Sequence, residues 1–98
     1  MTAYAKGARR EHDTMRLLEA AGYVCLRAAG SHGAFDVMAF STNDVRLVQV
    51  KSRDWPGAVE MAALRAFPAP PNTRKEVHRW RDGVRTPDVR HVLDGGGV

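Results

Sequence analysis

The sequence predicts a mixed α/β (α+β) fold in one small domain, with a central mixed β-sheet flanked by helices. The first observation is the order of patterns along the chain: a helical stretch, three short strand-like runs, a second helical stretch and two more strand-like runs. The second is the length of 98 residues, which supports one modest hydrophobic core. We therefore treat residues 1–98 as a single domain and expect residues 1–5 and 95–98 to be frayed.

Residues 8–21 carry the pattern of an amphipathic helix. Met15 and Leu18 are three residues apart and define an apolar stripe, and Gly22 supplies a stop signal. Extending this stripe back by one turn from Met15 reaches Glu11, so we expect this carboxylate on the core-facing side. The alternative for Glu11 is an acid in the first turn that interacts favourably with the helix dipole.

Residues 23–27 predict a short strand, which a loop rich in glycine, serine and histidine follows at 30–33. Such a loop lets the backbone approach a ligand closely. Two further apolar runs, 35–40 and 45–51, flank the turn composition Ser-Thr-Asn-Asp at 41–44. We predict that these two runs form an antiparallel pair of strands.

The polar residues of this strand pair fall at its ends. Strand alternation puts Gln49 and Lys51 on the same face as the apolar Leu47. Asp36 lies inside an apolar run, where a carboxylate is costly unless it is paired or binds a metal. We expect Glu11, Asp36, Gln49 and Lys51 to converge if the first helix packs on the sheet face that carries them.

The second half of the chain predicts a helix and a hairpin. Residues 58–67 are alanine-rich and end at Pro68, residues 73–81 alternate, and Asp82-Gly83 is a hairpin turn signal before a strand at 88–93. Lys75, Arg79 and Arg81 share one side of the alternating strand, where they would contact phosphates or lie in a solvated surface. We expect His78 to lie on a strand surface.

Composition restricts the partners and the compartment. Fifteen Lys and Arg against eleven Asp and Glu give a net charge of +4, which suits a polyanion such as nucleic acid and is also common among ordinary surfaces. The single cysteine, Cys25, cannot form an intramolecular disulfide, so a reducing cytoplasm is expected, in a prokaryotic cell or a phage-infected host. Neither a signal peptide nor a membrane span is visible, and we expect no membrane partner.

The polar residues at the strand ends suggest metal chemistry. Two carboxylates and an amide oxygen are hard ligands that suit Mg²⁺, or Mn²⁺ in its place, better than Zn²⁺. The backbone carbonyl of Val50 offers one more oxygen. A metal at this position would stabilise the charge that develops on a phosphodiester and lower the pKa of an attacking water. Lys51 would orient that water or stabilise the negative charge.

These residues resemble a known motif. Gly7 and Glu11 in the first helix, Gly30-Ser31, a strand Asp36, and Gln49-Val50-Lys51 resemble the PD-(D/E)xK nuclease superfamily. Within it, the chain looks most like the archaeal-type Holliday junction resolvases and their phage relatives, over about residues 6–52.

The resemblance implies a restriction-endonuclease-like fold and a Mg²⁺-dependent endonuclease that acts on four-way or other branched DNA, in recombination and repair. It implies metal-binding or catalytic roles for Glu11, Asp36 and Gln49, a catalytic role for Lys51, and a place beside the scissile phosphate for Ser31. A homodimer would present two sites to the two symmetric strands of a junction. The residues expected to contact DNA are Arg9, Arg10, Ser31, His32 and Arg53.

The chain departs from the family pattern at three points. Phe35 replaces a proline before the aspartate, Gln49 replaces the second acid, and the sequence after Trp55 does not match the resolvase pattern. Glu60 is a downstream acid that could reach back to compensate for Gln49. Two other functions therefore stay open: a nuclease of the same fold that acts on another DNA structure in repair or restriction, and a DNA-binding module that has lost cleavage.

Overall fold

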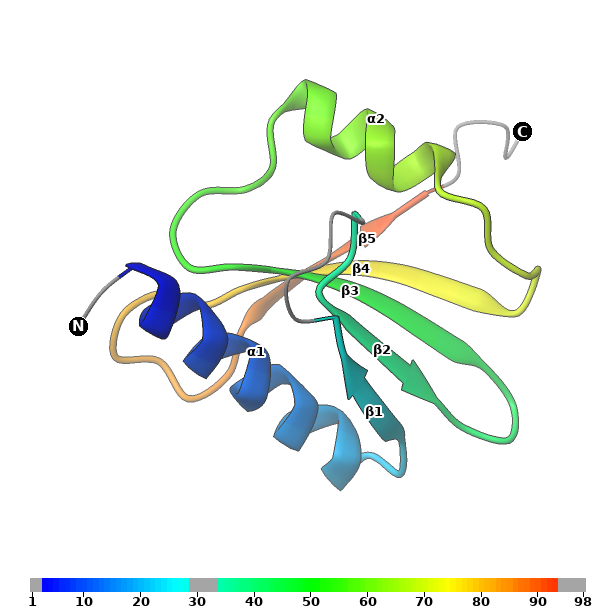
Figure 1. Cartoon of the computed structure of the whole chain (residues 1–98), viewed down its shortest axis with the longest axis horizontal. Coiled ribbons are helices and arrows are strands. Elements are labelled where there is room, and N and C mark those ends of the chain that lie inside the picture. Colours follow the sequence, from blue (N-terminus) through cyan, green and yellow to red (C-terminus); the bar gives the residue numbers. More distant parts are fainter. Residues whose placement is uncertain (1–2, 29–33, 94–98) are drawn as a thin grey trace.

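The computed structural model of the chain describes residues 3–28 and 34–93, and side chains from residue 7 onward within those ranges. Two helices and five strands make up the fold (Figure 1). Their bounds are α1 Ala3–Ala20, β1 Val24–Arg27, β2 Val37–Phe40, β3 Val45–Lys51, α2 Ala58–Ala66, β4 Thr73–Arg79 and β5 Asp88–Val92. Within the described ranges, neither helix is long and apolar enough to span a membrane.

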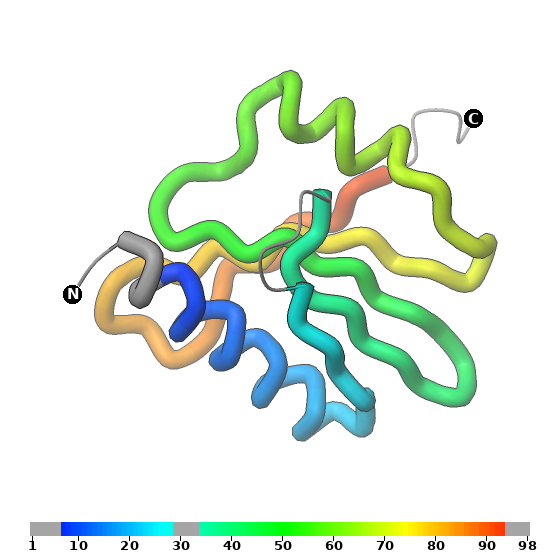
Figure 2. The backbone as a smooth tube through the Cα atoms, in the orientation of Figure 1, coloured from blue at the N-terminus to red at the C-terminus, as the bar shows by residue number. Residues whose placement is uncertain are grey.

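The strands form one mixed sheet in the order β1-β2-β3-β4-β5. The pairs β1–β2, β2–β3 and β4–β5 are antiparallel, whereas β3 and β4 run parallel. A parallel pair requires a crossover connection, and α2 supplies it. Figure 2 shows this crossover from green to yellow, on the opposite side of the sheet from α1 in blue. The predicted fold class and the antiparallel pair of strands around 41–44 are confirmed.

The two faces of the sheet carry separate hydrophobic clusters. Leu18 of α1 packs with Val37, Ala39 and Val48 on one face. On the other face, Leu64 of α2 packs in a cluster that also contains Phe35, Leu47, Val77 and Val92. Because Leu47 and Val48 are neighbours on β3, their side chains point to opposite faces. The helices therefore cover opposite faces of the sheet.

The ends of the elements refine the predicted boundaries. Gly22 follows α1 with a positive φ of 97°, and the backbone N–H of Tyr23 donates to the Leu18 carbonyl at 3.1 Å. A left-handed glycine with this hydrogen bond is a common C-terminal cap of a helix. Gly83 also has a positive φ, 77°, as the turn signal predicts. However, β4 ends at Arg79 and β5 begins at Asp88, so the connection is a longer loop over residues 80–87 than the tight hairpin that we predicted.

Three polar residues of β4 are buried, Lys75, Glu76 and His78, and the burial of Lys75 and His78 contradicts the predictions made for them. Lys75 is only 6% exposed, and its Nζ donates to the carbonyl oxygens of Arg65 and Phe67 at 3.0 and 2.7 Å. It therefore satisfies the carbonyl groups at the end of α2 rather than contacting DNA. His78 is 2% exposed under α1, where its Nδ1 lies 3.4 Å from Thr14 Oγ1. Alternation along the strand predicts which face of the sheet carries His78, but it does not predict that α1 covers this face.

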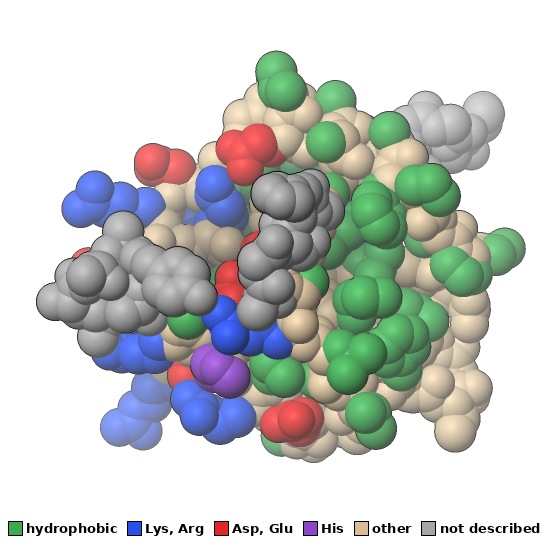
Figure 3. Space-filling model, viewed as in Figure 1, with side chains coloured by type: hydrophobic (Ala, Val, Ile, Leu, Met, Phe, Trp, Pro, Cys, Tyr) green, Lys and Arg blue, Asp and Glu red, His purple; other side chains and the backbone are tan. Residues whose placement is uncertain are grey.

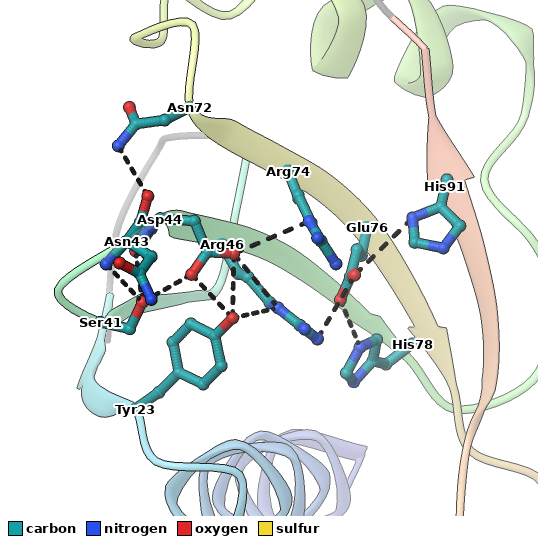
Figure 4. Close-up of polar contacts among 10 residues, drawn as sticks. All are labelled: Tyr23, Ser41, Asn43, Asp44, Arg46, Asn72, Arg74, Glu76, His78 and His91. Carbon is teal, nitrogen blue, oxygen red and sulfur yellow. Dashed lines mark hydrogen bonds and ion pairs between the residues drawn. The ribbon is translucent and has the colours of Figure 1, made fainter.

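Glu76 is the buried centre of a polar cluster (Figure 4). Its side chain is 2% exposed and lies 3.1 Å from His78 Nε2, 3.6 Å from Arg46 Nη1 and 3.7 Å from His91 Nδ1. Burial alone would raise the pKa of this carboxyl, but the hydrogen bond to His78 and the charges of Arg46, His78 and His91 outweigh it, so the pKa is lowered. We call Glu76, His78, Arg46 and His91 the Glu76 cluster.

Candidate active site

Asp36 lies just before β2 and is held by β3. Its backbone N–H donates to the Val48 carbonyl at 2.9 Å, and its carboxylate oxygen Oδ2 accepts from Val50 N–H at 2.8 Å. Burial raises the pKa of Asp36, and the negative charge of Glu11 raises it further. The hydrogen bond from Val50 and the charges of Lys51 and Arg27 lower the pKa without cancelling that rise. The structure thus holds a carboxylate where its charged form is disfavoured.

Glu11 faces β1 from the side of α1. Its Oε1 accepts a hydrogen bond from Arg27 Nε at 2.7 Å, and the two side chains are 19% and 22% exposed. The prediction that Glu11 lies on the inward side of the helix is therefore consistent with its position. Sequence reasoning missed Arg27, which ends β1. Because strand β1 pairs with β2, Arg27 lies beside the Asp36 end of the sheet, and only this pairing could have indicated it.

Gln49 and Lys51 lie near the carboxyl end of β3. Gln49 Nε2 donates to the Ala34 carbonyl at 3.5 Å, while its Oε1 is buried without a hydrogen-bond partner among the described residues. Lys51 Nζ lies 3.3 Å from Glu60 Oε2, and this lysine side chain is 28% exposed. Glu60 therefore reaches back to the site from the first turn of α2, where its Oε1 also accepts from Gly57 N–H at 3.5 Å.

The route by which we expected these groups to converge is wrong. Helix α1 packs on the face that carries Val48, which is opposite to the face of Gln49 and Lys51. The chain also bends before β2, since Phe35 packs on the α2 face and Val37 on the α1 face. Asp36 is therefore at the end of the sheet, where charges from α1 and from β3 both act on its pKa.

The donor atoms at this end suit a hard divalent cation. The side chains offer the carboxylates of Glu11 and Asp36 and the unpartnered Oε1 of Gln49. In the described part of the chain, no three His, Cys, Asp or Glu residues are grouped so that they could hold a metal by themselves. A cation here would therefore also require the neutral oxygens of Gln49 and the Val50 backbone.

The predicted DNA contacts have different positions. Arg9 is exposed on α1, and Arg53 is exposed in the segment between β3 and α2. Arg10 is only 5% exposed, and its Nη1 and Nη2 donate at 3.2 Å to Asp13 and to the Arg81 carbonyl. Arg10 is thus a buried residue with protein partners, which corrects the prediction that it contacts DNA directly. Ser31 and His32 lie outside the described residues.

The mixed sheet has an acid before one strand and a lysine at the end of the next, which is the arrangement that the motif implied. The family model of the archaeal Holliday junction resolvases (Hjc) matches residues 2–60, more than half of the chain. The chain therefore belongs to this family, and its membership makes it a nuclease of the junction-resolving class. A search of curated protein sequences found no match.

A solved structure extends the likeness beyond the family segment. Hjc of Archaeoglobus fulgidus, a Holliday junction resolvase from an archaeal hyperthermophile, superposes with a TM-score of 0.73 at 23% identity. The match covers 88% of this chain and 77% of that one. At this identity it shows the fold alone. It also confirms the predicted fold for the second half of the chain, where the sequence does not match the resolvase pattern.

Proposed function

We propose that the protein is a Mg²⁺-dependent homodimeric endonuclease that hydrolyses phosphodiester bonds at four-way DNA junctions. The observation that carries this proposal is the position of Asp36. It is tied to β3 by two hydrogen bonds, yet its pKa is raised by burial and by the neighbouring Glu11. Such an arrangement destabilises the ionised carboxylate of the metal-free protein and favours a bound cation.

The residues that would hold the cation are Glu11, Asp36, Gln49 through Oε1, and Val50 through its carbonyl. Oxygen donors of this kind select Mg²⁺, with Mn²⁺ as a substitute, over softer metals. When bound, the ion supplies Lewis-acid stabilisation of the phosphodiester charge and a water of lowered pKa. Gln49 contributes no negative charge, so we expect weaker metal affinity than a third carboxylate would give.

Lys51 would act on the phosphate or on the attacking water. Its ammonium group is held 3.3 Å from Glu60, which anchors it at the end of β3 beside Asp36. A fixed ammonium can neutralise charge that develops on a non-bridging phosphate oxygen, or donate a hydrogen bond that orients the water. Arg27, which pairs with Glu11, would keep that carboxylate directed toward the site.

The DNA would be contacted mainly through its backbone. The exposed Arg9 and Arg53 carry charges suited to phosphates. Ser31 would lie beside the scissile phosphate, as the family resemblance implies, and His32 would be a further phosphate contact. A four-way junction has two symmetric strands to cut, so two copies related by a two-fold axis would place one site on each. We expect a cytoplasmic protein.

The direct test is cleavage of a synthetic four-way junction beside the matching linear duplex, first in Mg²⁺ and then in EDTA. We expect paired nicks in the junction that EDTA abolishes, and light scattering should give the mass of a dimer. Cutting of the duplex or of flaps instead would support a nuclease of the same fold with another substrate. Tight junction binding without cleavage in Mg²⁺ or Mn²⁺ would support a DNA-binding module.

Lys51→Ala tests the role of the lysine. We expect it to reduce junction cleavage by about 10²-fold or more, because transition-state charge loses its partner, while junction binding stays within a few-fold of wild type. The measurements are single-turnover cleavage in Mg²⁺ and binding in EDTA. Lys51→Arg is the matched control, since it keeps the charge but not the compact ammonium. Equal cleavage by wild type and Lys51→Ala would remove Lys51 from the proposed mechanism.

A further inference from the structure

A groove of about 460 Å³ lies between residues 9–17 of α1 and the loop of residues 80–87. We call it the arginine groove. Its charged lining consists of Arg9, Arg10, Asp13, Arg16 and Arg85. Four guanidinium groups against one carboxylate leave three positive charges without a compensating acid in the groove. Lys and Arg side chains gather around the α1 end of the molecule in Figure 3, whereas hydrophobic side chains lie mainly on the opposite side of that view.

The floor of the arginine groove is held together by contacts between α1 and the loop. Trp80 is 3% exposed, and its Nε1 donates to Thr14 Oγ1 at 2.8 Å. The Arg10 guanidinium lies 5.4 Å from the centre of the Trp80 ring and donates to the carbonyl of Arg81, so it links α1 to the loop. These contacts hold together the two segments that carry the exposed cations, so the conformational entropy lost on binding a ligand is smaller.

The exposed cations are available for a ligand. Arg9 and Arg85 form no hydrogen bond or ion pair with any residue that the structure describes. Arg16 is 70% exposed and contacts only Asp13, at 2.5 Å, within the described ranges. Arg9 and Arg16 are seven residues apart on α1, which separates them by about 10 Å along the helix axis. Cations separated in this way suit an extended polyanion better than a single small anion.

The arginine groove is connected to the candidate active site through the backbone of the sheet. The backbone N–H of Trp80 donates to the Lys51 carbonyl at 2.7 Å. Trp80 directly follows Arg79, the residue of β4 that pairs with Lys51 of β3. The floor of the groove is therefore joined to the backbone of the proposed catalytic lysine. Arg85, however, lies beyond residue 60, where the family match ends. The groove combines the family segment with a loop that the family match does not cover.

We propose that the arginine groove binds the sugar–phosphate backbone of a DNA arm beside the cleaved strand, independently of base sequence. The inference rests on the proposed function and adds a contact site to it. Guanidinium groups bind phosphate oxygens through two parallel hydrogen bonds, and each such contact releases counterions from DNA. The groove then holds the arm while Asp36 and Lys51 face the scissile bond.

The test is binding of a synthetic four-way junction in EDTA over about 50 to 300 mM salt. The variant is Arg9→Ala/Arg85→Ala, and the matched control is Arg65→Ala/Arg74→Ala, two exposed arginines away from the groove. We expect the groove variant to bind at least about tenfold more weakly at low salt. The slope of log K against log salt should fall by roughly 2, since each phosphate contact contributes about 0.9. The control should keep the wild-type slope.

The outcomes separate this inference from the proposed function. If wild type cuts junctions but the groove variant has the slope and affinity of the control, the groove is not a DNA contact and the proposed function stands. If wild type neither binds nor cuts branched DNA, both are overturned. A misfolded variant would lower the melting temperature, but a structural defect alone would not reduce the salt slope by the number of arginines removed.

Discussion

Asp36 and Glu76 are two carboxylates beside the central strand β3, and their surroundings differ. Glu76 pairs in register with Val48, is almost fully buried, and is surrounded by Arg46, His78 and His91. Its pKa is lowered despite burial. Asp36 is tied to the same strand, but burial and the negative charge of Glu11 raise its pKa.

The difference separates a structural charge from one that we propose to be functional. In the Glu76 cluster each carboxylate oxygen has a cationic or hydrogen-bonding partner, so the charge stabilises the native packing of α1 over β4. At Asp36 the protein keeps a second acid, Glu11, and the amide oxygen of Gln49, which has no hydrogen-bond partner in the described part of the chain. That arrangement lowers the stability of the metal-free protein and is suited to binding a cation.

Asp36→Asn should produce the largest effect and should act in opposite directions on activity and stability. We expect junction cleavage to fall by about 10³-fold or more, because a ligand charge for the proposed metal is lost. The melting temperature of the metal-free variant should rise by a few degrees, since Asn removes a disfavoured charge and can still accept from Val50 N–H. Thermal unfolding in EDTA and single-turnover cleavage in Mg²⁺ measure the two effects.

The metal dependence of stability provides the control for this prediction. Mg²⁺ should raise the melting temperature of wild type, by binding the native state only, and should not do so for Asp36→Asn. A variant that is destabilised in EDTA would show that Asp36 is a structural carboxylate like Glu76. It would break the comparison between the two regions.

The pH dependence of stability should differ in sign between the two carboxylates. Between the unfolded and the raised folded pKa of Asp36, the native state binds more protons, so its contribution to stability falls as pH rises. For Glu76 the folded pKa is lowered, so its contribution is present above the unfolded pKa and is lost as pH falls through the folded value. Urea unfolding of wild type, Asp36→Asn and Glu76→Gln between about pH 3 and 7 tests both signs.

Glu76→Gln should destabilise the fold and spare the chemistry. Removing this charge takes the nearby anion from the partly buried guanidinium of Arg46 and from the buried imidazole of His78, and we expect a loss of about 2 kcal/mol in the free energy of unfolding. Cleavage well below the melting temperature should stay at the wild-type rate. The exposed Glu19→Gln is the control and should change stability by less than about 0.5 kcal/mol. A wild-type melting temperature for Glu76→Gln would contradict this role.

The sequence predicted the elements better than their mutual packing. Periodicity and turn residues identify both helices and all five strands, because these signals are local. The face on which α1 packs could not be predicted, because strand alternation applies only within a strand and the chain bends between Phe35 and Val37. Burial of His78, and the pairing of Lys75 with the end of α2, depend on contacts between distant segments.

In the candidate site, too, the sequence predicted the residues better than their contacts. Glu11, Asp36, Gln49 and Lys51 were identified from residue types and spacing, which are visible along the chain. The partners that orient them were not: Arg27 reaches Glu11 only because β1 pairs with β2. The sequence suggests Glu60 as a possible acid in place of Gln49, whereas in the structure Glu60 forms an ion pair with Lys51.

Glu60→Gln should give the smallest effect, and its design separates orientation of Lys51 from stability of α2. Gln retains an oxygen that can accept from Gly57 N–H at the start of the helix but has no charge for Lys51. We expect cleavage to fall by about two- to fivefold with no change in melting temperature, because a half-exposed ion pair contributes little to stability. Glu60→Ala, which also removes the cap, should show the same loss of cleavage together with a lower melting temperature. Faster cleavage by Glu60→Gln would mean that Glu60 withholds Lys51 from the phosphate, and Glu60 would then belong with the structural charges rather than with the site.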